Sequence, residues 1–322
     1  MNVLVIGSAS PLARVLLPAL LNDKRIKRVI GADIRTGGFA HPNYRFRPVD
    51  VRAPELAVSL AEVDAVIHLG FAATGRRFGP FKLTRELMRD INVRGSQNAF
   101  TLAAEQGVKH VILLSSAAVY GLDGLHRGSF TENHPRRPLS GFSYAEDKIV
   151  VEGWLDEFEQ THPALRIVRL RPHVIFGAHV NHYAKKLLLR LPFYPRLPEP
   201  QPLTQCVHED DVVQAILLTL FGNVRGAFNL ATANAIPFRD LQRQLHRRLV
   251  PVPLWLAKLL IGLGSRLFGF NTGASWIESL RYNFALHSGR ARRELGWKPR
   301  YDTVGECLQA FNTGTHGQNN KV

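Results

Sequence analysis

The feature that most constrains the fold is the alternation of short apolar runs with helical patterns in the first half of the chain. The runs are continuous, which is typical of strands buried on both faces of a sheet. They lie at 3–6, 28–32, 65–69, 111–114 and 167–170, and another lies at 227–230. Helical patterns follow at 11–21, 84–106 and 144–158. This order predicts an α/β fold with a doubly wound parallel sheet.

Composition narrows the classes of protein. The chain has 322 residues, of which 45% are hydrophobic, enough for a large domain with a smaller lobe. Two cysteines, Cys206 and Cys307, supply no disulfide framework and no metal-ligand set. Met1 leads directly into an apolar run without a basic leader, so we expect no signal peptide and a cytoplasmic location. The net charge of +15 includes no basic block interleaved with aromatic residues, which argues against a nucleic-acid partner.

A loop suited to phosphate joins the first strand to the first helix. Gly7, Ser10 and Ala13 recur at intervals of three, where a dinucleotide loop needs small residues near the pyrophosphate. Pro11 suits a first helical turn, and the helix N-terminus would stabilise the phosphate charge. An ordinary tight turn is the alternative. The candidate cofactor-binding residues here are Gly7, Ser10, Pro11 and Leu12.

Acidic residues follow the next two strands. Asp33 can accept hydrogen bonds from both ribose hydroxyls and repel a 2′-phosphate, which favours NAD over NADP. Arg35 is the counter-argument, because it could pair with a 2′-phosphate, although a solvated loop residue is the simpler interpretation. Asp50 and Val51 could meet the adenine edge, while a turn cap is the ordinary role of such an aspartate.

The most specific pattern is Ser115-Ser116 with Val119-Tyr120-Gly121, followed by Tyr144 and Lys148. Tyr144 and Lys148 are four residues apart, so they share one face of a helix. A neighbouring ammonium favours a phenolate, which would let Tyr144 exchange a proton near neutral pH. Ser116, at a strand end, could hydrogen-bond the same substrate oxygen.

These segments together resemble the extended short-chain dehydrogenases/reductases, the NAD-dependent epimerase/dehydratase superfamily. The resemblance spans nearly the whole chain and includes segments at 66–70, 91–98, 171–177, 207–212 and 293–299. It implies a Rossmann-type fold, NAD as cofactor, Tyr144 as catalytic acid/base, Lys148 as its partner and Ser116 as the oxygen-positioning hydroxyl. Tyr144 and Lys148 would also contact the cofactor, with Lys148 reaching the ribose hydroxyls. The remaining residues that it implicates are Asn92, which would orient the catalytic segment, and Leu69, Gly70, Phe71 and Pro172, which would contact the cofactor.

The second half would supply the substrate lobe. We expect residues 1–172 to form the NAD-binding domain, with 206–234 returning to it. Residues 173–205 and 235–313 would form a smaller, mostly helical lobe, followed by a flexible tail at 314–322. Within the lobe, 192–202 contains five prolines and is expected to be irregular, and 241–249 is expected to be helical. The apolar stretch 251–270 suggests a core helix or an apolar pocket wall, with membrane-surface contact as an alternative.

The leading functional hypothesis is an NAD-dependent oxidoreductase acting on a secondary alcohol or ketone. The substrate would be a small molecule, apolar or anionic, since an excess of nine basic residues falls within 173–322. The alternatives are a nucleotide-sugar epimerase or dehydratase with recycled NAD, and a non-catalytic NAD(P)-binding sensor or scaffold. Val174 stands where nucleotide-sugar epimerases carry an asparagine, which weakens the first alternative. The resemblance also implies a homodimer, because members of this family often dimerise by packing two helices from each subunit, here near 84–106 and 144–160.

Overall fold

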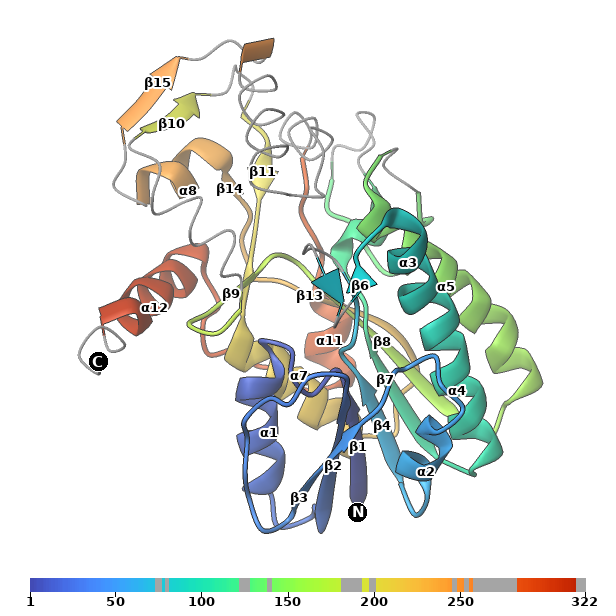
Figure 1. Cartoon of the computed structure of the whole chain (residues 1–322). Coiled ribbons are helices and arrows are strands. Elements are labelled where there is room, and N and C mark those ends of the chain that lie inside the picture. The colour runs from blue at the N-terminus through green and yellow to red at the C-terminus, as the bar shows by residue number, and fades with distance from the viewer. Residues whose placement is uncertain are drawn as a thin grey trace.

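The core of the protein is a seven-stranded sheet in which every neighbouring pair of strands is parallel (Figure 1). The computed structural model describes residues 1–72, 77–78, 81–121, 128–137, 141–180, 193–196, 201–244, 248–251, 255–256 and 283–316. In spatial order the strands are β13 (Gly226–Leu230), β8 (Arg166–Pro172), β7 (His110–Leu114), β4 (Ala65–His68), β1 (Asn2–Ile6), β2 (Arg28–Asp33) and β3 (Tyr44–Pro48). The predicted Rossmann-type fold is confirmed.

Helices cover both faces of this sheet, which explains the continuous apolar strands. In β1, Val3 and Val5 pack on one face, and Leu4 and Ile6 pack on the other. The first face is covered by α1 (Ala13–Leu21), α7 (Glu209–Phe221) and α11 (Gly289–Glu294). The second face is covered by α2 (Leu56–Leu60), α4 (Gly95–Glu105) and α5 (Ser143–Thr161).

The strand order reverses at β1, which lies between β2 and β4. In such sheets the ligand crevice lies beyond the carboxyl ends of the strands at this point. Two glycines follow these ends, Gly7 after β1 and Gly70 after β4. A Cβ on Gly7 would lie 2.4 Å from the backbone nitrogen of Gly70, and Gly7 has a φ of +83°. Only glycine fits there, so the two loops approach closely at the crevice.

The predicted helix at 84–106 is interrupted, which corrects the sequence expectation. It consists of α3 (Arg85–Arg89), a π-helical turn η1 (Asp90–Arg94) and α4. The Thr84 side chain caps α3 by accepting a hydrogen bond from the Leu87 N–H. A π turn shifts the backbone hydrogen bonds by one residue without ending the helix, and such turns are frequent at functional sites. Here the turn carries Asn92.

A smaller group of elements lies above the carboxyl edge of the sheet (Figure 1). It includes the short strands β10 (Phe193–Arg196), β11 (Leu203–Thr204), β14 (Ile236–Pro237) and β15 (Arg248–Pro251), and α8 (Phe238–Gln244). Further short elements are β5 (Arg77–Phe78), β6 (Phe81–Lys82), the 3-10 turn η2 (Ala117–Tyr120), β9 (Ile175–Phe176), β12 (Val207–His208) and α12 (Val304–His316).

Three expectations for this half are corrected. The predicted helix at 241–249 is wrong at its end, because α8 ends at Gln244 and residues 248–251 pair with β10 as a strand. Strand β10 likewise lies inside the proline-rich stretch expected to be irregular. The predicted tail begins too early, because α12 continues through His316, anchored by Val304, Cys307 and Leu308 in a small core. Most of the apolar stretch 251–270 lies outside the described residues. Within the described part, no helix is long and apolar enough to cross a membrane.

Candidate active site

The loop after β1 has the features that a dinucleotide pyrophosphate requires. The Ser10 N–H donates to the Gly7 carbonyl at 2.9 Å, which closes a tight turn before α1. The hydroxyl of Ser10 is buried and has no hydrogen-bond partner. Helix α1 has no side-chain cap at its N-terminus, and the N–H groups of its first turn donate to the carbonyls of the preceding loop, so the positive end of the helix dipole faces this loop and favours an anion. Pro11 is exposed, whereas the Leu12 side chain is in the core and could contribute only its backbone.

Asp33 at the end of β2 is oriented by two backbone hydrogen bonds. Its Oδ2 accepts from the Ala9 N–H at 3.0 Å, and its Oδ1 accepts from the Arg35 N–H at 3.0 Å. The carboxylate therefore lies beside the phosphate loop, where a ribose is expected. The Arg35 side chain is 68% exposed, and its Nε lies 3.9 Å from Asp33, as expected for a solvated loop residue.

The two candidates after β3 have partners within the protein. Asp50 accepts hydrogen bonds from the backbone and the guanidinium of Arg52, with Oδ2 at 2.6 Å from Nη2. Val51 packs against Gly95 at the start of α4, where a Cβ would lie 2.4 Å from Val51 Cγ1. The turn-capping role considered for Asp50 is thus present, and any contact with an adenine would be additional.

The loop after β4 joins the crevice to the catalytic candidates. Leu69 and Gly70 donate backbone hydrogen bonds to the Ile6 carbonyl, at 2.9 and 3.0 Å. The next residue, Phe71, packs edge-on against Tyr144 with ring centroids 5.4 Å apart. Lys148 Nζ lies 3.6 Å from the Phe71 ring centroid, a cation–π distance. Phe71 therefore contacts both Tyr144 and Lys148, the two candidate residues of α5.

Ser116, Tyr144 and Lys148 are brought together at the carboxyl end of β7. Ser116 begins the turn η2, and its Oγ accepts from the Ala118 N–H at 3.2 Å. Its side chain also lies near enough to Tyr144, in the first turn of α5, to oppose the rise that burial causes in the pKa of that tyrosine. Lys148 is only 2% exposed and donates from Nζ to the Leu114 carbonyl at 2.6 Å. The three predicted residues therefore lie near one another at this end of the sheet.

The electrostatics of this cluster differ from the sequence expectation in one respect. Burial raises the pKa of Tyr144 above its ordinary value, and the hydrogen bond from Ser116 opposes that shift. The Lys148 Nζ lies over the Tyr144 ring at 5.8 Å from its centroid, and it is held closer to the Leu114 carbonyl and the Phe71 ring. Burial also lowers the pKa of Lys148 to about 7, although Glu152 and Asp147 act in the opposite direction. The amine is therefore only partly charged at neutral pH.

Asn92 occupies the position that the sequence motif indicated, and a second residue accompanies it. Its Oδ1 accepts from the Ala72 N–H at 2.7 Å, which fixes the loop after Phe71. Its Nδ2 donates to the Ala72 carbonyl and to Asp147 Oδ2, at 3.0 and 2.9 Å. Asp147 is fully buried and also accepts two hydrogen bonds from Arg85. Sequence reasoning missed Asp147, although its position between Tyr144 and Lys148 was a usable signal.

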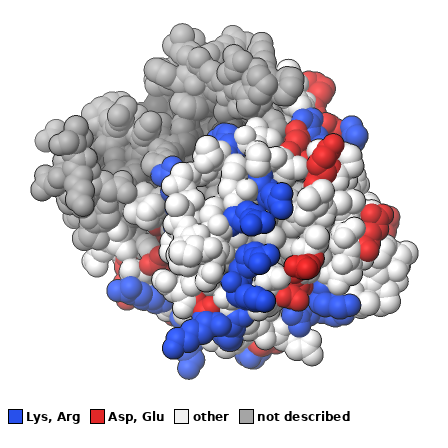
Figure 2. Space-filling model, turned by 60° about the horizontal axis from the view of Figure 1, so that its bottom comes forward, with Lys and Arg blue, Asp and Glu red and all other residues white. Residues whose placement is uncertain are grey.

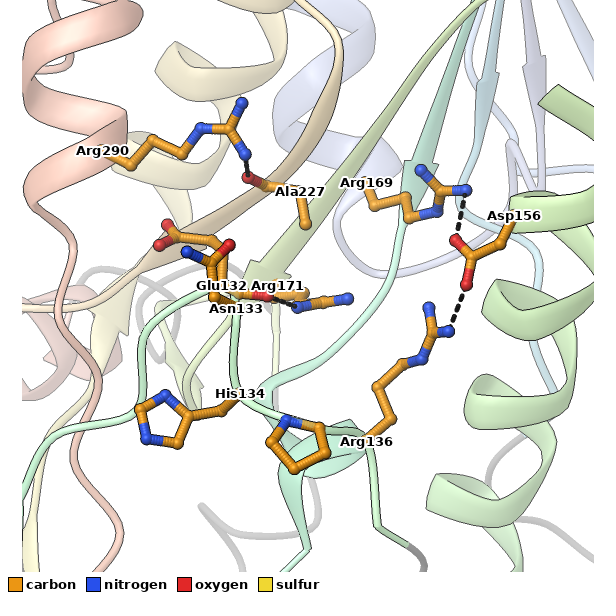
Figure 3. A pocket seen from close by; sticks show the side chains of 10 residues that line it. Glu132, Asn133, His134, Arg136, Asp156, Arg169, Arg171, Ala227 and Arg290 are labelled. Atoms are coloured by element: carbon orange, nitrogen blue, oxygen red, sulfur yellow. Dashed lines mark hydrogen bonds and ion pairs between the residues drawn. The ribbon is translucent and has the colours of Figure 1, made fainter. Parts of the chain in front are cut away.

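A network of arginines and carboxylates supports the strand end behind Ser116. Ser115 donates to the buried carboxylate of Glu152, which also pairs with Arg171 and Arg136. Burial alone would raise the pKa of Glu152, but Arg171 and Ser115 outweigh it and hold the pKa below its usual value. A pocket of about 300 Å³ lies beside this network, and each arginine on its wall has a carboxylate partner. Figure 3 shows the pairs that Arg136 and Arg169 form with Asp156. Sequence reasoning also missed this network.

Two candidates lie at the carboxyl end of β8. Pro172 is buried and stands opposite Leu230 in the sheet register. Val174, two residues further on, is 45% exposed. It is one of few large apolar side chains exposed in the described part of the chain. The surface beyond β8 therefore offers an apolar group at this position.

Comparisons with known proteins identify the family. The family model of NAD-dependent epimerases/dehydratases matches residues 3–231. An uncharacterised protein of Mycobacterium tuberculosis is 27% identical over 314 residues, covering 94% of this chain and 81% of that protein. UDP-glucose 4-epimerase of Streptococcus mutans is 25% identical, covering 96% of this chain and 95% of that enzyme. The solved structure of MoeE5 with UDP-glucuronic acid and NAD has a TM-score of 0.75 at 23% identity, covering 98% of this chain and 99% of MoeE5.

The sheet, the phosphate loop and the Asp33 carboxylate define a dinucleotide-binding protein of the Rossmann class. The chain belongs to the NAD-dependent epimerase/dehydratase family. It is therefore an NAD-dependent enzyme of that general type. Its own residues fit the cofactor, because the orphaned Ser10 hydroxyl, the uncapped α1 N-terminus and Asp33 lie around one crevice.

Proposed function

We propose that the protein transfers a hydride between NAD and a secondary alcohol or ketone through Ser116, Tyr144 and Lys148. The observation that carries the proposal is the proximity of the Ser116 side chain to Tyr144, where it opposes the rise in pKa that burial causes, together with the buried Lys148 one helical turn away. Two hydroxyls at one point can hold one carbonyl or carbinol oxygen and exchange a proton with it. When bound, NAD supplies or accepts the hydride.

Each residue then has a defined task. Tyr144 donates a proton to the carbonyl oxygen in the reducing direction and accepts it back in the oxidising direction. Ser116 holds the same oxygen and stabilises the phenolate of Tyr144 by donating a hydrogen bond. Lys148, whose pKa is about 7, can be protonated or neutral at physiological pH, and its amine is held by the Leu114 carbonyl one helical turn from Tyr144.

Asp33 supports NAD rather than NADP as the cofactor, and Val174 supports a partly apolar substrate. Asp33 favours the two free ribose hydroxyls of NAD, and Arg35 forms only a long contact with it. Val174 places an apolar group where the nucleotide-sugar epimerases carry a polar asparagine. A substrate that is partly apolar suits this position better than a sugar ring that requires a hydrogen-bond donor.

The second candidate is a nucleotide-sugar epimerase or dehydratase that keeps and recycles its NAD. The similarity over nearly full length to a UDP-glucose 4-epimerase favours it. The two candidates differ in one outcome, because an oxidoreductase accumulates NADH and an epimerase does not. We expect a panel of secondary alcohols with NAD to yield NADH. Melting temperatures raised by UDP or dTDP sugars, with no NADH from any alcohol, would favour the epimerase instead.

A further inference from the structure

A second hollow lies at the amino-terminal edge of the sheet, on the opposite side from Tyr144. Its volume is about 330 Å³, and it is lined by Lys27, Arg28, Pro42, Asn43, Tyr44 and Arg45. The sheet register explains why these residues meet. Strands β2 and β3 are parallel and begin together, with Val29 opposite Tyr44. The residues before and at both strand starts therefore surround one space.

The positive charges in this hollow are not balanced by acids in the part of the chain that the structure describes. Lys27, Arg28 and Arg45 are exposed and form no ion pair with any acid in the described ranges, and no acid lines the hollow. The neighbouring Arg25 differs, because it pairs with Asp23 at 2.6 Å. The arginine-lined pocket of Figure 3 differs too, because carboxylates neutralise each of its guanidiniums.

The positive charge continues along the same edge of the sheet. Lys109 precedes β7, Arg166 begins β8 and Arg225 precedes β13. The Arg166 N–H donates to the Lys109 carbonyl, so these two residues are neighbours. Burial and the charge of Arg225 lower the pKa of Arg166, as expected where cations crowd together. Figure 2 turns this edge toward the viewer and shows Lys and Arg side chains in a band across it.

An edge strand often carries charged residues that prevent pairing with another sheet. That role explains Arg45, which lies on the edge strand β3. It does not explain Arg28, which lies on the inner strand β2, or Lys27 just before it. Three unpaired cations around a hollow instead match the requirements of an anion.

We propose that this hollow binds a molecule with two or more adjacent phosphoryl groups. Guanidinium groups bind phosphoryl oxygens in a forked geometry, and two of them, with the Lys27 ammonium, can neutralise several negative charges. The side-chain amide of Asn43 adds a neutral donor. The hollow is much larger than the roughly 30 Å³ that one water occupies, so it admits more than a single small ion. The proposal is independent of the proposed reaction, because the hollow and the catalytic cluster lie at opposite edges of the sheet.

The test is calorimetric titration of the protein with inorganic tripolyphosphate at low salt, with NAD saturating. The bound NAD keeps the probe away from the loop at Gly7. We expect Arg28→Gln/Arg45→Gln to weaken binding by roughly tenfold or more. The matched control is Arg293→Gln/Lys298→Gln, which removes the same charge from two other exposed residues without ion pairs in the described structure. Equal weakening in both double variants, or no binding by the unmodified protein, would overturn the proposal.

A second arm distinguishes the source of the phosphoryl groups. The same variants are tested for binding to vesicles of phosphatidylcholine with phosphatidylinositol bisphosphate. If both probes lose binding only in Arg28→Gln/Arg45→Gln, the hollow also accepts phosphorylated lipid headgroups. If only tripolyphosphate binding is lost, the hollow takes a soluble polyphosphate compound. Vesicle binding that both double variants weaken equally belongs to the net charge of +15 and excludes the lipid source.

Discussion

Asn92 and Asp147 meet in the core, where the Asn92 Nδ2 donates to the Asp147 Oδ2 at 2.9 Å. This bond joins the π turn η1 to helix α5, between the positions of Tyr144 and Lys148. Arg85 completes the junction by donating two hydrogen bonds to the same carboxylate. Helix α5, which carries Tyr144 and Lys148, is therefore fixed by a buried acid whose own side chain takes no part in the proposed reaction.

Replacing that acid should affect both stability and the pH dependence of turnover. We expect Asp147→Asn to lower the free energy of unfolding by roughly 1–3 kcal/mol, because Arg85, itself a third exposed, loses its main partner. Loss of the negative charge should also lower the pKa of Lys148 further. Denaturant unfolding and the pH–rate profile check the two effects. Glu146→Gln is the control, since its contact with Arg85 is longer at 3.3 Å, and equal effects in both variants would contradict this account.

The buried amine of Lys148 predicts an unusual pH dependence of stability without NAD. Unfolded lysine titrates near pH 10.4, and Lys148 titrates at about 7 in the folded protein. Between these values the unfolded chain binds one more proton, so the free energy of unfolding gains up to about 1.4 kcal/mol per pH unit from this group. Below pH 7 both states are protonated and the contribution is constant. Lys148→Met should therefore lose stability relative to the unmodified protein as the pH rises from 7 to 9. If the curves of unfolding free energy against pH ran parallel for Lys148→Met and the unmodified protein, they would contradict the depressed pKa of Lys148. Lys298→Met, at an exposed lysine, is the control and should give a curve parallel to that of the unmodified protein.

Asp33 should determine the choice between NAD and NADP. Its carboxylate is held beside the loop by the Ala9 and Arg35 N–H groups and would repel a 2′-phosphate. We expect Asp33→Asn to reduce the preference for NAD over NADP by roughly tenfold or more, measured as the ratio of the two Kd values. Arg35→Gln, at an exposed side chain, should leave NAD affinity nearly unchanged. A preference that stays constant in Asp33→Asn would remove this residue from the ribose site.

Removing Glu152 while its arginine partners remain should lower the free energy of unfolding strongly. Glu152→Gln leaves the buried Arg171 without its carboxylate, and we expect a loss of about 3–5 kcal/mol in the free energy of unfolding. Glu157→Gln, at an exposed position of the same helix, should change stability by less than about 0.5 kcal/mol. Denaturant unfolding of both variants checks the contrast. Similar stability in the two would show that Arg171 finds another partner.

Much of the fold could be predicted because two periodicities are visible in the sequence. Continuous apolar runs indicated strands buried on both faces, and the four-residue spacing of Tyr144 and Lys148 placed both on one helical face. The π turn at Asp90–Arg94 was not predictable, because one extra residue in a turn barely alters the apolar pattern. Strand β15 was missed because its partner, β10, is distant in sequence.

The supporting residues of the site were harder to predict than the catalytic candidates. Asp147 and Glu152 have the composition of a solvated helix face, and only the packing of α5 against η1 and β8 shows that they are buried. The direction of the Lys148 amine likewise depends on the Leu114 carbonyl, a backbone atom that carries no sequence signal. Sequence spacing therefore located the candidate catalytic residues, but it could not predict the burial and contacts that shift their pKa values.

The most direct test of the central claim is the rate of NADH formation by Tyr144→Phe with a secondary alcohol that the unmodified enzyme oxidises. Removing one hydroxyl deletes the proton-transfer group and keeps the ring that packs on Phe71. We predict that turnover falls by roughly 10²- to 10⁴-fold, while the Kd of NAD stays within about twofold. Turnover close to that of the unmodified enzyme would contradict the assignment of Tyr144 as the catalytic acid/base.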